Sequence, residues 1–151
     1  MKIEVDQSGK IEETAKRTVI GDSLGNTVVV RSADKRSIQE LYRLSGQPRK
    51  FVIHLFSVLL SILIAKSFTL TKTYIIDTEY PGKEDEISLL VCEFCAKNGV
   101  ILSSSQLQFR RIGKSSEAHK TSHKKFTSKY LRDYLSITEI LKYLLPQKRT
   151  E

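Results

Sequence analysis

Short alternations of apolar and polar residues open the chain and predict strands. The first covers residues 2–6, and similar runs follow at 18–20 and 27–31. Alternation at every second residue is typical of a strand with one buried face, and the Gly- and Asn-containing stretch 21–26 favours a hairpin turn. This part of the chain therefore predicts a three-stranded antiparallel meander, while the polar stretch 10–17 fits either a loop or an extension of the first strand.

Helical spacing replaces the alternation after residue 33. Asp34 is the expected N-cap of a helix whose apolar face carries Ile38, Leu41, Tyr42 and Leu44. The glycine and proline that follow are expected to interrupt this pattern, because neither residue continues a helix well.

A second helix is expected to begin near Arg49 and to include the most hydrophobic stretch, Phe51–Ala65, which only His54 and two serines interrupt. A membrane span needs roughly 20 apolar residues. The stretch is shorter, so it predicts a helix buried against a sheet and no stable membrane insertion, with His54 as a hydrogen-bonded core or interface residue. A helix on a membrane surface, flanked by Arg49, Lys50 and Lys66, remains the alternative.

Strand and helix patterns alternate through the rest of the chain. The run 73–77 is short, continuous and β-branched, as in a strand covered on both faces. Caps and acidic first turns indicate where the later helices begin. The expected elements are a helix from 84 to about 97, a strand at 107–112, a helix from 116 into the 120s, and a last helix that Ser136 and Glu139 begin and Pro146 ends.

The order of these elements predicts a single α/β domain over residues 1–151. Three antiparallel strands are followed by alternating helices and strands, which is the pattern of a mixed sheet with helices on both faces. Residues 131–151 form a C-terminal helix and tail in this interpretation. A chain of 151 residues is long enough to bury a real core within one such domain.

Charge is concentrated at one end of the chain. The formal net charge is +8, and residues 107–151 contribute +7 of it, with 11 Lys or Arg against four acids. A one-sided basic segment is typical of a surface that binds polyanions, although a solvated surface gives the same pattern. Two cysteines and a charged N-terminus without an apolar leader favour a cytoplasmic protein over a secreted, disulfide-built one.

Three acids follow or end predicted strands. Asp6 closes the first strand, and Asp77 and Glu79 close the strand at 73–77. Sites in open sheets collect at the carboxyl ends of strands, so these carboxylates converge if the two strands are neighbours. Such a cluster repels itself unless a cation compensates, and oxygen ligands select Mg²⁺ or Mn²⁺. The alternative is that each acid caps a turn or faces water.

The element order and the positions of these acids resemble the ribonuclease H-like superfamily, which includes RuvC-type Holliday-junction resolvases. That resemblance implies one acid on strand one, matched by Asp6, and a second at the end of strand four, matched by Glu79 or Asp77. It also implies a last ligand near the start of the final conserved helix, where His119 matches best and Glu117 is the spare. The apolar run from Phe51 and the lack of paired aspartates near His119 depart from the family pattern.

The resemblance implies a nuclease that hydrolyses phosphodiester bonds with Mg²⁺ or Mn²⁺, and branched or structured DNA is among its substrates. Two ions about 3.5 to 4 Å apart would be bridged by Asp6, with Glu79 (or Asp77) on one and His119 on the other. DNA is expected ahead of RNA, and a homodimer is compatible with symmetric cleavage of two strands. The basic residues expected to hold nucleic acid are Lys83, Arg110, Arg111, Lys114, Lys120, Lys124 and Lys125.

Other motifs predict less. Cys92 and Cys95 are spaced as in redox proteins, but they lie late in a helix and lack a second pair for zinc, which favours thiols in the core. His119 and His123 are spaced as zinc ligands, yet Lys120 stands where a metalloprotease needs its glutamate. The rivals to a nuclease are a non-catalytic module that binds nucleic acid or protein, and a membrane-surface protein.

Overall fold

The computed structural model describes residues 1–145, which form a five-stranded sheet and five α-helices. The predicted class, α/β with a mixed sheet, is confirmed for this part of the chain. The elements are β1 (Lys2–Ser8), β2 (Thr18–Asp22), β3 (Thr27–Val30), α1 (Ser32–Leu44), α2 (Phe51–Ala65), β4 (Thr73–Asp77), α3 (Glu84–Lys97), β5 (Leu107–Arg110), α4 (Glu117–Phe126) and α5 (Ile137–Leu144), with 3₁₀ turns at Pro48–Lys50 and Ser104–Gln106.

The sheet has the strand order β3-β2-β1-β4-β5. The predicted antiparallel meander is present, because β1 pairs with β2 and β2 with β3 in antiparallel fashion. The other two strands run parallel to β1, with β4 as its direct neighbour. The first strand and the strand at 73–77 therefore end at the same edge of the sheet, which is the condition for their acids to meet.

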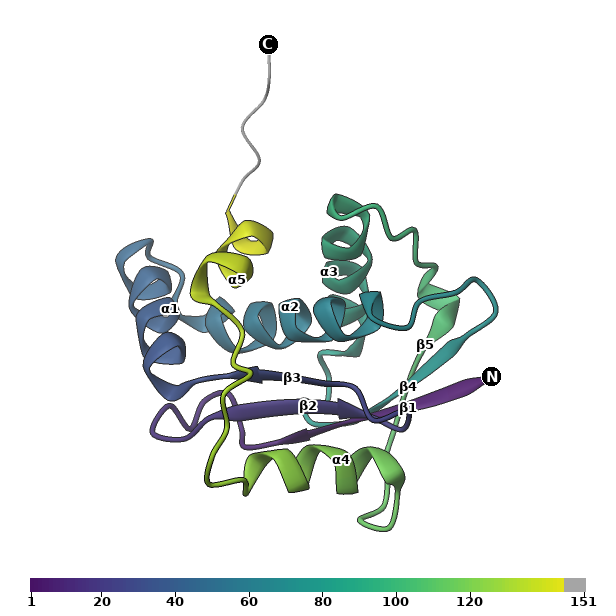
Figure 1. Ribbon diagram of the computed structural model, residues 1–151. Helices are drawn as coiled ribbons and strands as arrows, with labels where there is room; N and C mark the ends of the chain where they lie inside the picture. Colours follow the sequence, from purple (N-terminus) through teal and green to yellow (C-terminus); the bar gives the residue numbers. More distant parts are fainter. Residues whose placement is uncertain (146–151) are drawn as a thin grey trace.

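Helices cover both faces of the sheet, as predicted (Figure 1). Helix α4 lies alone on one face, and α1, α2, α3 and α5 lie on the other. The chain crosses from α4 to α5 in front of β3, so its last part spans both layers.

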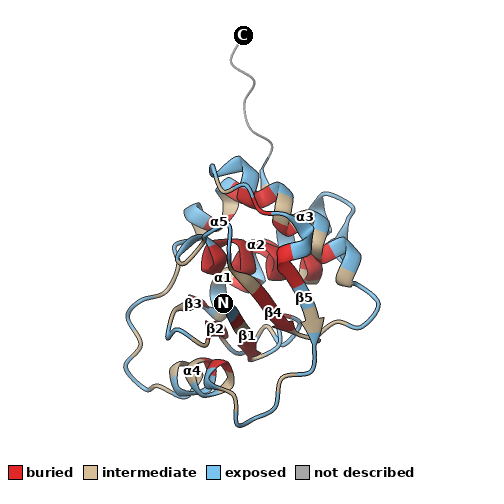
Figure 2. Cartoon of the chain, turned by 90° about the vertical axis from the view of Figure 1, so that its right-hand side faces the viewer, coloured by how far each residue is buried: buried red, intermediate tan, exposed pale blue. Residues whose placement is uncertain are grey.

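Helix α2 is the centre of the core and has the bounds of the apolar run, whereas the predicted start near Arg49 lies in the 3₁₀ turn Pro48–Lys50. Of its 15 residues, 12 are buried, and Figure 2 shows much of α2, β1 and β4 in the colour of buried residues. The stretch Pro48–Ala65 is long and apolar enough to cross a membrane, but 67% of it is buried inside the protein. His54 is hydrogen-bonded as expected, with 3.1 Å between its Nδ1 and the hydroxyl oxygen of Tyr42.

Helix α1 differs from its prediction. It begins at Ser32 after the N-cap Arg31, three residues earlier than Asp34 implied. Asp34 lies in the first turn of the helix, 3.7 Å from Arg31. Its negative charge is stabilising there, near the positive end of the helix dipole, and this explains why an acid occurs at this position without being the N-cap. Leu41 and Leu44 are 47% and 76% exposed, and the apolar face is narrower than predicted.

Several strand boundaries also differ. β2 continues to Asp22, two residues past its predicted end, so Gly21 lies in the strand and not in the turn, and β3 stops at Val30, one residue early. β1 continues to Ser8 because the residues after Val5 pair with β2. β5 stops at Arg110, two residues early, because the backbone N–H of Ile112 donates to the Asp77 side chain instead of to a strand. The helices at 84–97 and from 117 are confirmed, and Ser136 caps α5 by accepting from the N–H of Glu139. The predicted stop at Pro146 lies outside the described residues.

Candidate metal centre

The sheet register brings three acids together. Val5 of β1 is the register partner of Ile76 of β4, so the residues after them, Asp6 and Asp77, are neighbours on the same face. Glu79 follows two residues after Asp77, and one carboxylate oxygen of each of the three acids lies within 4.8 Å of the others. The predicted convergence of these side chains at the carboxyl ends of adjacent strands is therefore confirmed.

Backbone hydrogen bonds hold the end of β4 in place. Asp77 Oδ1 accepts from the N–H of Ile112 at 2.6 Å, and the N–H of Thr78 donates to the carbonyl of Arg110 at 3.2 Å. The N–H of Glu79 turns back to the carbonyl of Asp77 at 2.9 Å. This tight turn returns the Glu79 carboxylate toward the strand ends.

His119 reaches the same site from α4. The hydroxyl of Ser116 caps this helix by accepting from the N–H of His119 at 3.0 Å, which fixes the first turn. His119 Nδ1 lies 2.8 Å from Asp6 Oδ2, so the two predicted site residues are in direct hydrogen-bond contact. His119 is not part of the set of three mutually close carboxylates, and it touches the centre through Asp6 alone among the described contacts.

The position of α4 depends on a close approach to the sheet. Gly21 of β2 is the register partner of Asp6, and a Cβ at Gly21 would lie 2.8 Å from the backbone nitrogen of Ser122. Next to it, the hydroxyls of Ser8 and Ser122 are 2.9 Å apart and share a buried hydrogen bond. Gly21 and these serines place the first turn of α4 over Asp6, and the sequence-based prediction did not include them.

Burial and mutual repulsion make the acids hard to ionise together. Burial and the charge of Asp77 raise the pKa of Asp6, against the lowering effect of its hydrogen bond with His119. Burial, a hydrogen bond with Asp77 and the charges of Asp77 and Asp6 raise the pKa of Glu79 to about 8, and the nearby charge of Lys10 acts in the opposite direction. A divalent cation would relieve this repulsion, and three hard oxygen donors suit Mg²⁺ or Mn²⁺.

The spare ligand of the prediction does not join this group. The Glu117 side chain is 70% exposed and lies 3.4 Å from Lys120 Nζ. Lys10, in contrast, comes from the stretch 10–17 that the sequence left open, and it lines a small pocket with Glu79. The polar sequence of that stretch does not indicate that Lys10 lies near Glu79, because their proximity depends on how the loop folds back on the sheet.

The basic residues predicted to hold nucleic acid differ in exposure and in whether an acid neutralises them. Arg110 is exposed and ends β5 beside Asp77. Lys83 is 3.8 Å from Glu86, and Lys125 is 2.7 Å from Asp133, so these two are partly neutralised. Arg111, Lys114 and Lys124 are exposed. A basic surface thus surrounds α4 and the loop before it.

The cysteines and the histidine pair carry no further site. Cys95 is buried and Cys92 half-buried, and both are free thiols. Burial raises the pKa of Cys95 to about 11, which suits a core residue and not a reactive thiol. His119 and His123 stack with ring centroids 5.6 Å apart.

Comparison with known protein families, with characterised proteins and with solved structures finds no match to this chain.

Proposed function

We propose that this protein is a nuclease that hydrolyses phosphodiester bonds with Mg²⁺ or Mn²⁺ and has a ribonuclease H-like domain. The observation that carries the proposal is the meeting of Asp6, Asp77 and Glu79 within 4.8 Å at the ends of two parallel strands. Asp6 is buried and the other two acids are half-buried. Carboxylates that repel one another in such surroundings cost free energy, and a bound cation offsets that cost.

Each side chain has a separate role in this proposal. Asp6, Asp77 and Glu79 hold the metal, which when bound activates a water molecule and stabilises the leaving oxygen. His119 orients the Asp6 carboxylate through its 2.8 Å hydrogen bond, so it is a positioning residue. This assignment gives Asp77 the place that the resemblance offered to His119.

The order of elements supports the ribonuclease H-like assignment. A three-stranded antiparallel meander precedes the helices, and two parallel strands extend the sheet from β1. Two features depart from the pattern that the resemblance implies: α2 is strongly apolar, and the paired aspartates of resolvases are missing near His119. The second departure motivates the positioning role of His119.

The basic surface supports a nucleic-acid substrate. Arg110 ends β5 beside Asp77, and exposed Arg111 and Lys114 lie in the loop that leads to α4. Cations beside a metal centre hold flanking phosphates and favour encounter with DNA. DNA, including branched or structured DNA, is the expected substrate, and the protein is expected in the cytoplasm, where the chain would act alone or as a homodimer.

The test combines metal binding with cleavage. We would titrate Mn²⁺ into the wild type and Asp6→Asn by calorimetry, and then offer both proteins a four-way junction, duplex DNA and an RNA–DNA hybrid. The proposal expects binding and cleavage in the wild type and loss of both in Asp6→Asn, because asparagine lacks the negative charge that the cation needs.

Glu117→Gln is the matched control, because it removes an exposed acid on α4 that lies outside the three-acid group. It should bind Mn²⁺ and cleave like the wild type. If the wild type neither binds Mn²⁺ nor cleaves but still binds DNA, the protein is a non-catalytic binding module. Salt-sensitive binding to liposomes without DNA binding would favour the membrane-surface alternative, which the burial of α2 disfavours.

A further inference from the structure

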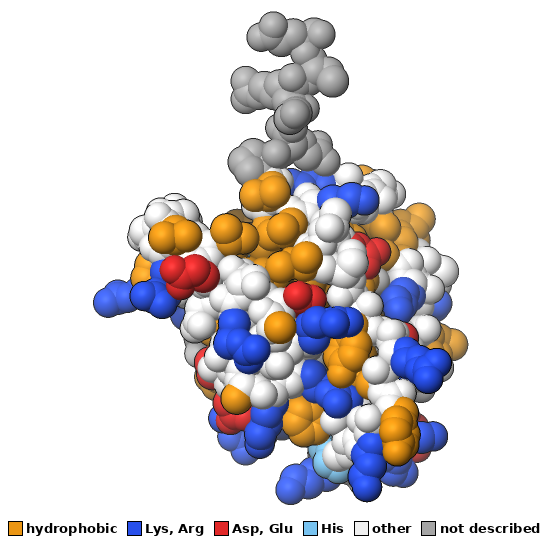
Figure 3. Space-filling view, turned by 60° about the vertical axis from the view of Figure 1, so that its left-hand side comes forward, with side chains coloured by type: hydrophobic (Ala, Val, Ile, Leu, Met, Phe, Trp, Pro, Cys, Tyr) orange, Lys and Arg blue, Asp and Glu red, His pale blue; other side chains and the backbone are white. Residues whose placement is uncertain are grey.

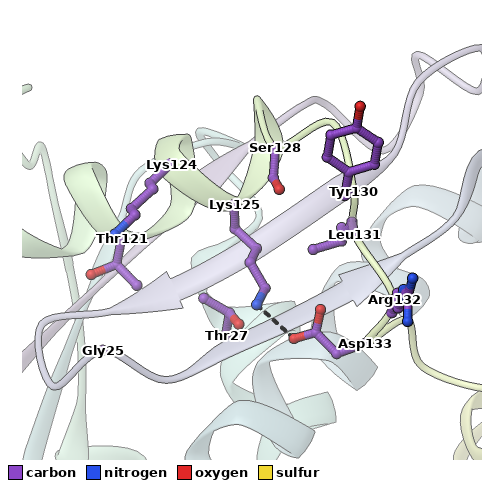
Figure 4. Close-up of a pocket in the computed structure, with 10 residues that line it drawn as sticks. All are labelled: Gly25, Thr27, Thr121, Lys124, Lys125, Ser128, Tyr130, Leu131, Arg132 and Asp133. Carbon is purple, nitrogen blue, oxygen red and sulfur yellow. Dashed lines mark ion pairs between the residues drawn. The ribbon is translucent and has the colours of Figure 1, made fainter.

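A second candidate site lies beside α4, toward β3, whereas the acids lie toward β4. It is a pocket of about 600 Å³ between the β2–β3 hairpin, the second half of α4 and the segment that follows (Figure 4). Thr27 comes from the hairpin side, Lys124 and Lys125 from α4, and Tyr130 and Arg132 from the segment 128–133. The three-acid centre shares none of these residues.

Positive charge exceeds negative charge in this pocket. Lys125 is paired with Asp133 at 2.7 Å, which leaves Lys124 and Arg132 as cations beyond that ion pair. Lys66 does not line the pocket but lies next to it, because its Nζ donates to the carbonyl of Thr27 at 2.9 Å. In Figure 3, lysine and arginine side chains are widespread over the lower part of the face shown. The pocket suits a ligand with more than one negative charge.

An aromatic ring that is largely exposed to solvent also lines this pocket. Tyr130 is 89% exposed, more than any other large hydrophobic side chain in the described part of the chain. Figure 4 shows its ring held away from the strands with the hydroxyl pointing outward. Exposing a ring costs hydrophobic free energy, and a flat ring next to cations is typical of surfaces on which nucleic-acid bases stack.

The same combination continues past the end of α4. A neighbouring pocket of about 330 Å³ contains Arg17, Arg31 and Tyr134. The guanidinium groups of Arg17 and Arg31 lie 5.7 and 4.5 Å from the centroid of the Tyr134 ring. Arg17 also donates to the carbonyl of Ser128, which lines the first pocket, so the two pockets are adjacent.

We propose that the two pockets form one groove, here called the basic–aromatic groove, that binds single-stranded nucleic acid. Lys124 and Arg132 hold backbone phosphates, and one base stacks on Tyr130. The reason for this binding rests on the proposed function: the groove would hold an unpaired strand of the nucleic acid that is cleaved at the three-acid centre. Binding itself needs no metal and is measured separately.

The experiment measures fluorescence anisotropy of labelled oligonucleotides in EDTA. The probes are 15-nucleotide poly-dT, 15-nucleotide poly-U and a 15-base-pair DNA duplex. Tyr130→Ala should weaken binding of both single strands about tenfold, since stacking of one base is lost. Tyr130→Phe, which keeps the ring, should bind like the wild type, and the duplex should respond to neither substitution.

Charge is tested with the double variant Lys124→Glu, Arg132→Glu. It should weaken single-strand binding at least tenfold and make the dependence on salt shallower, because phosphate contacts are lost. Lys142→Glu, an exposed site on α5 in the other layer, is the matched control and should bind like the wild type. Thermal melting monitored by circular dichroism verifies that each variant is folded.

Several outcomes overturn the proposal. Equal binding by Tyr130→Ala and the wild type, or an equal loss in Tyr130→Phe, removes the stacking role. Undiminished binding by the charge-reversed double variant removes the groove as the site. Asp6→Asn separates the two proposals, because it should lose Mn²⁺ binding and still bind poly-dT normally. If the wild type binds poly-dT but does not bind Mn²⁺, only the proposed nuclease is contradicted.

Discussion

Glu79 shows how its surroundings change the chemistry of one side chain. Its pKa of about 8 follows from burial, from the hydrogen bond with Asp77 and from the charges of Asp77 and Asp6. At pH 7 the metal-free protein therefore holds a proton on Glu79. A cation that takes three carboxylate ligands must displace this proton.

Metal affinity should consequently depend on pH. The Mn²⁺ affinity of the wild type should rise as pH increases from 6 to 8 and level off above 8, with up to one proton released per ion. Asp77→Asn removes a negative neighbour and lowers the pKa of Glu79, so the remaining affinity should level off at lower pH. Asparagine can still accept from the N–H of Ile112, which preserves the turn.

Calorimetry in buffers of different ionisation enthalpy measures both the affinity and the released protons. An affinity that is constant between pH 6 and 8 would contradict this account of Glu79.

Lys35 is the residue that the sequence least indicated. It is fully buried, and its Nζ donates to the carbonyls of Lys10 and Glu13 and to the hydroxyl of Thr18. Burial lowers the pKa of Lys35 to about 8. Helical periodicity places Lys35 on the same side of α1 as Ile38 and Tyr42, which are three and seven residues further on, but a lysine at such a position does not by itself indicate burial. Only the path of the loop 10–17 explains why its ammonium is covered.

Lys35→Met should lower the free energy of unfolding by about 2 to 4 kcal/mol, because it removes three hydrogen bonds that a buried ammonium donates to the loop 10–17 and to Thr18. Arg36→Met is the matched control, since Arg36 is exposed and makes one exposed hydrogen bond to the same loop. It should change stability by less than about 0.5 kcal/mol. Urea denaturation of the two variants measures the difference, and equal losses would show that the buried ammonium does not hold the loop.

At the scale of elements, the approach of α4 to the sheet places His119 over Asp6. That approach depends on Gly21, which has an ordinary backbone conformation and is small because a helix backbone lies against it. The sequence pattern predicts Gly21 as a turn residue. The structure places it within β2, where a glycine is needed because the backbone of α4 packs against it.

Gly21→Ala should therefore disturb the site as well as the fold. The new Cβ would lie 2.8 Å from the nitrogen and 3.1 Å from the Cα of Ser122, so α4 must shift. We expect a loss of about 1 to 3 kcal/mol in the free energy of unfolding, together with weaker binding of Mn²⁺. Gly113→Ala, whose Cβ would meet only Ser115 Oγ at 3.8 Å, is the control for adding a methyl group.

In Gly21→Ala, both the stability measured by urea denaturation and the Mn²⁺ affinity measured by calorimetry should decrease. In Gly113→Ala, neither should change. A stable Gly21→Ala protein with unchanged Mn²⁺ binding would show that the position of α4 tolerates this methyl group.

Elements with a strong local pattern were predictable. The bounds of α2 follow from its apolar run, and those of α3 and α4 follow from their acidic turns and caps. Asp6, Asp77 and Glu79 could be selected because strand-end acids are visible in the sequence. The N-cap of α1, the end of β5 and the proximity of Lys10 to Glu79 could not, because each depends on a contact with a distant segment.

At the scale of the whole molecule, the acids and most of the cations come from different segments, although Arg110 ends β5 beside Asp77. The carboxylates meet between β1 and β4, whereas basic side chains follow α4, the loop before it and the segment after it. Binding and cleavage should therefore be separable functions of the same protein.

Duplex DNA binding should weaken steeply with salt and should not need the acids. Each phosphate contact adds about −0.9 to the slope of log affinity against log salt, so raising salt fourfold costs roughly 3.5-fold per contact. Asp6→Asn should give the same slope as the wild type while losing cleavage. Anisotropy titrations at 50 to 200 mM NaCl measure the slope, and a different slope for Asp6→Asn would show that the two regions are coupled.

The crossing of the chain from α4 to α5 also shields the open side of the sheet. The N–H of Leu135 donates to the carbonyl of Val29 at 2.8 Å, so the segment between α4 and α5 lies against β3, one of the two edge strands. Unpaired outer strands recruit other chains and initiate aggregation. The segment between α4 and α5 thus covers this edge of the sheet. Releasing that segment would expose β3 to pairing with strands of other copies.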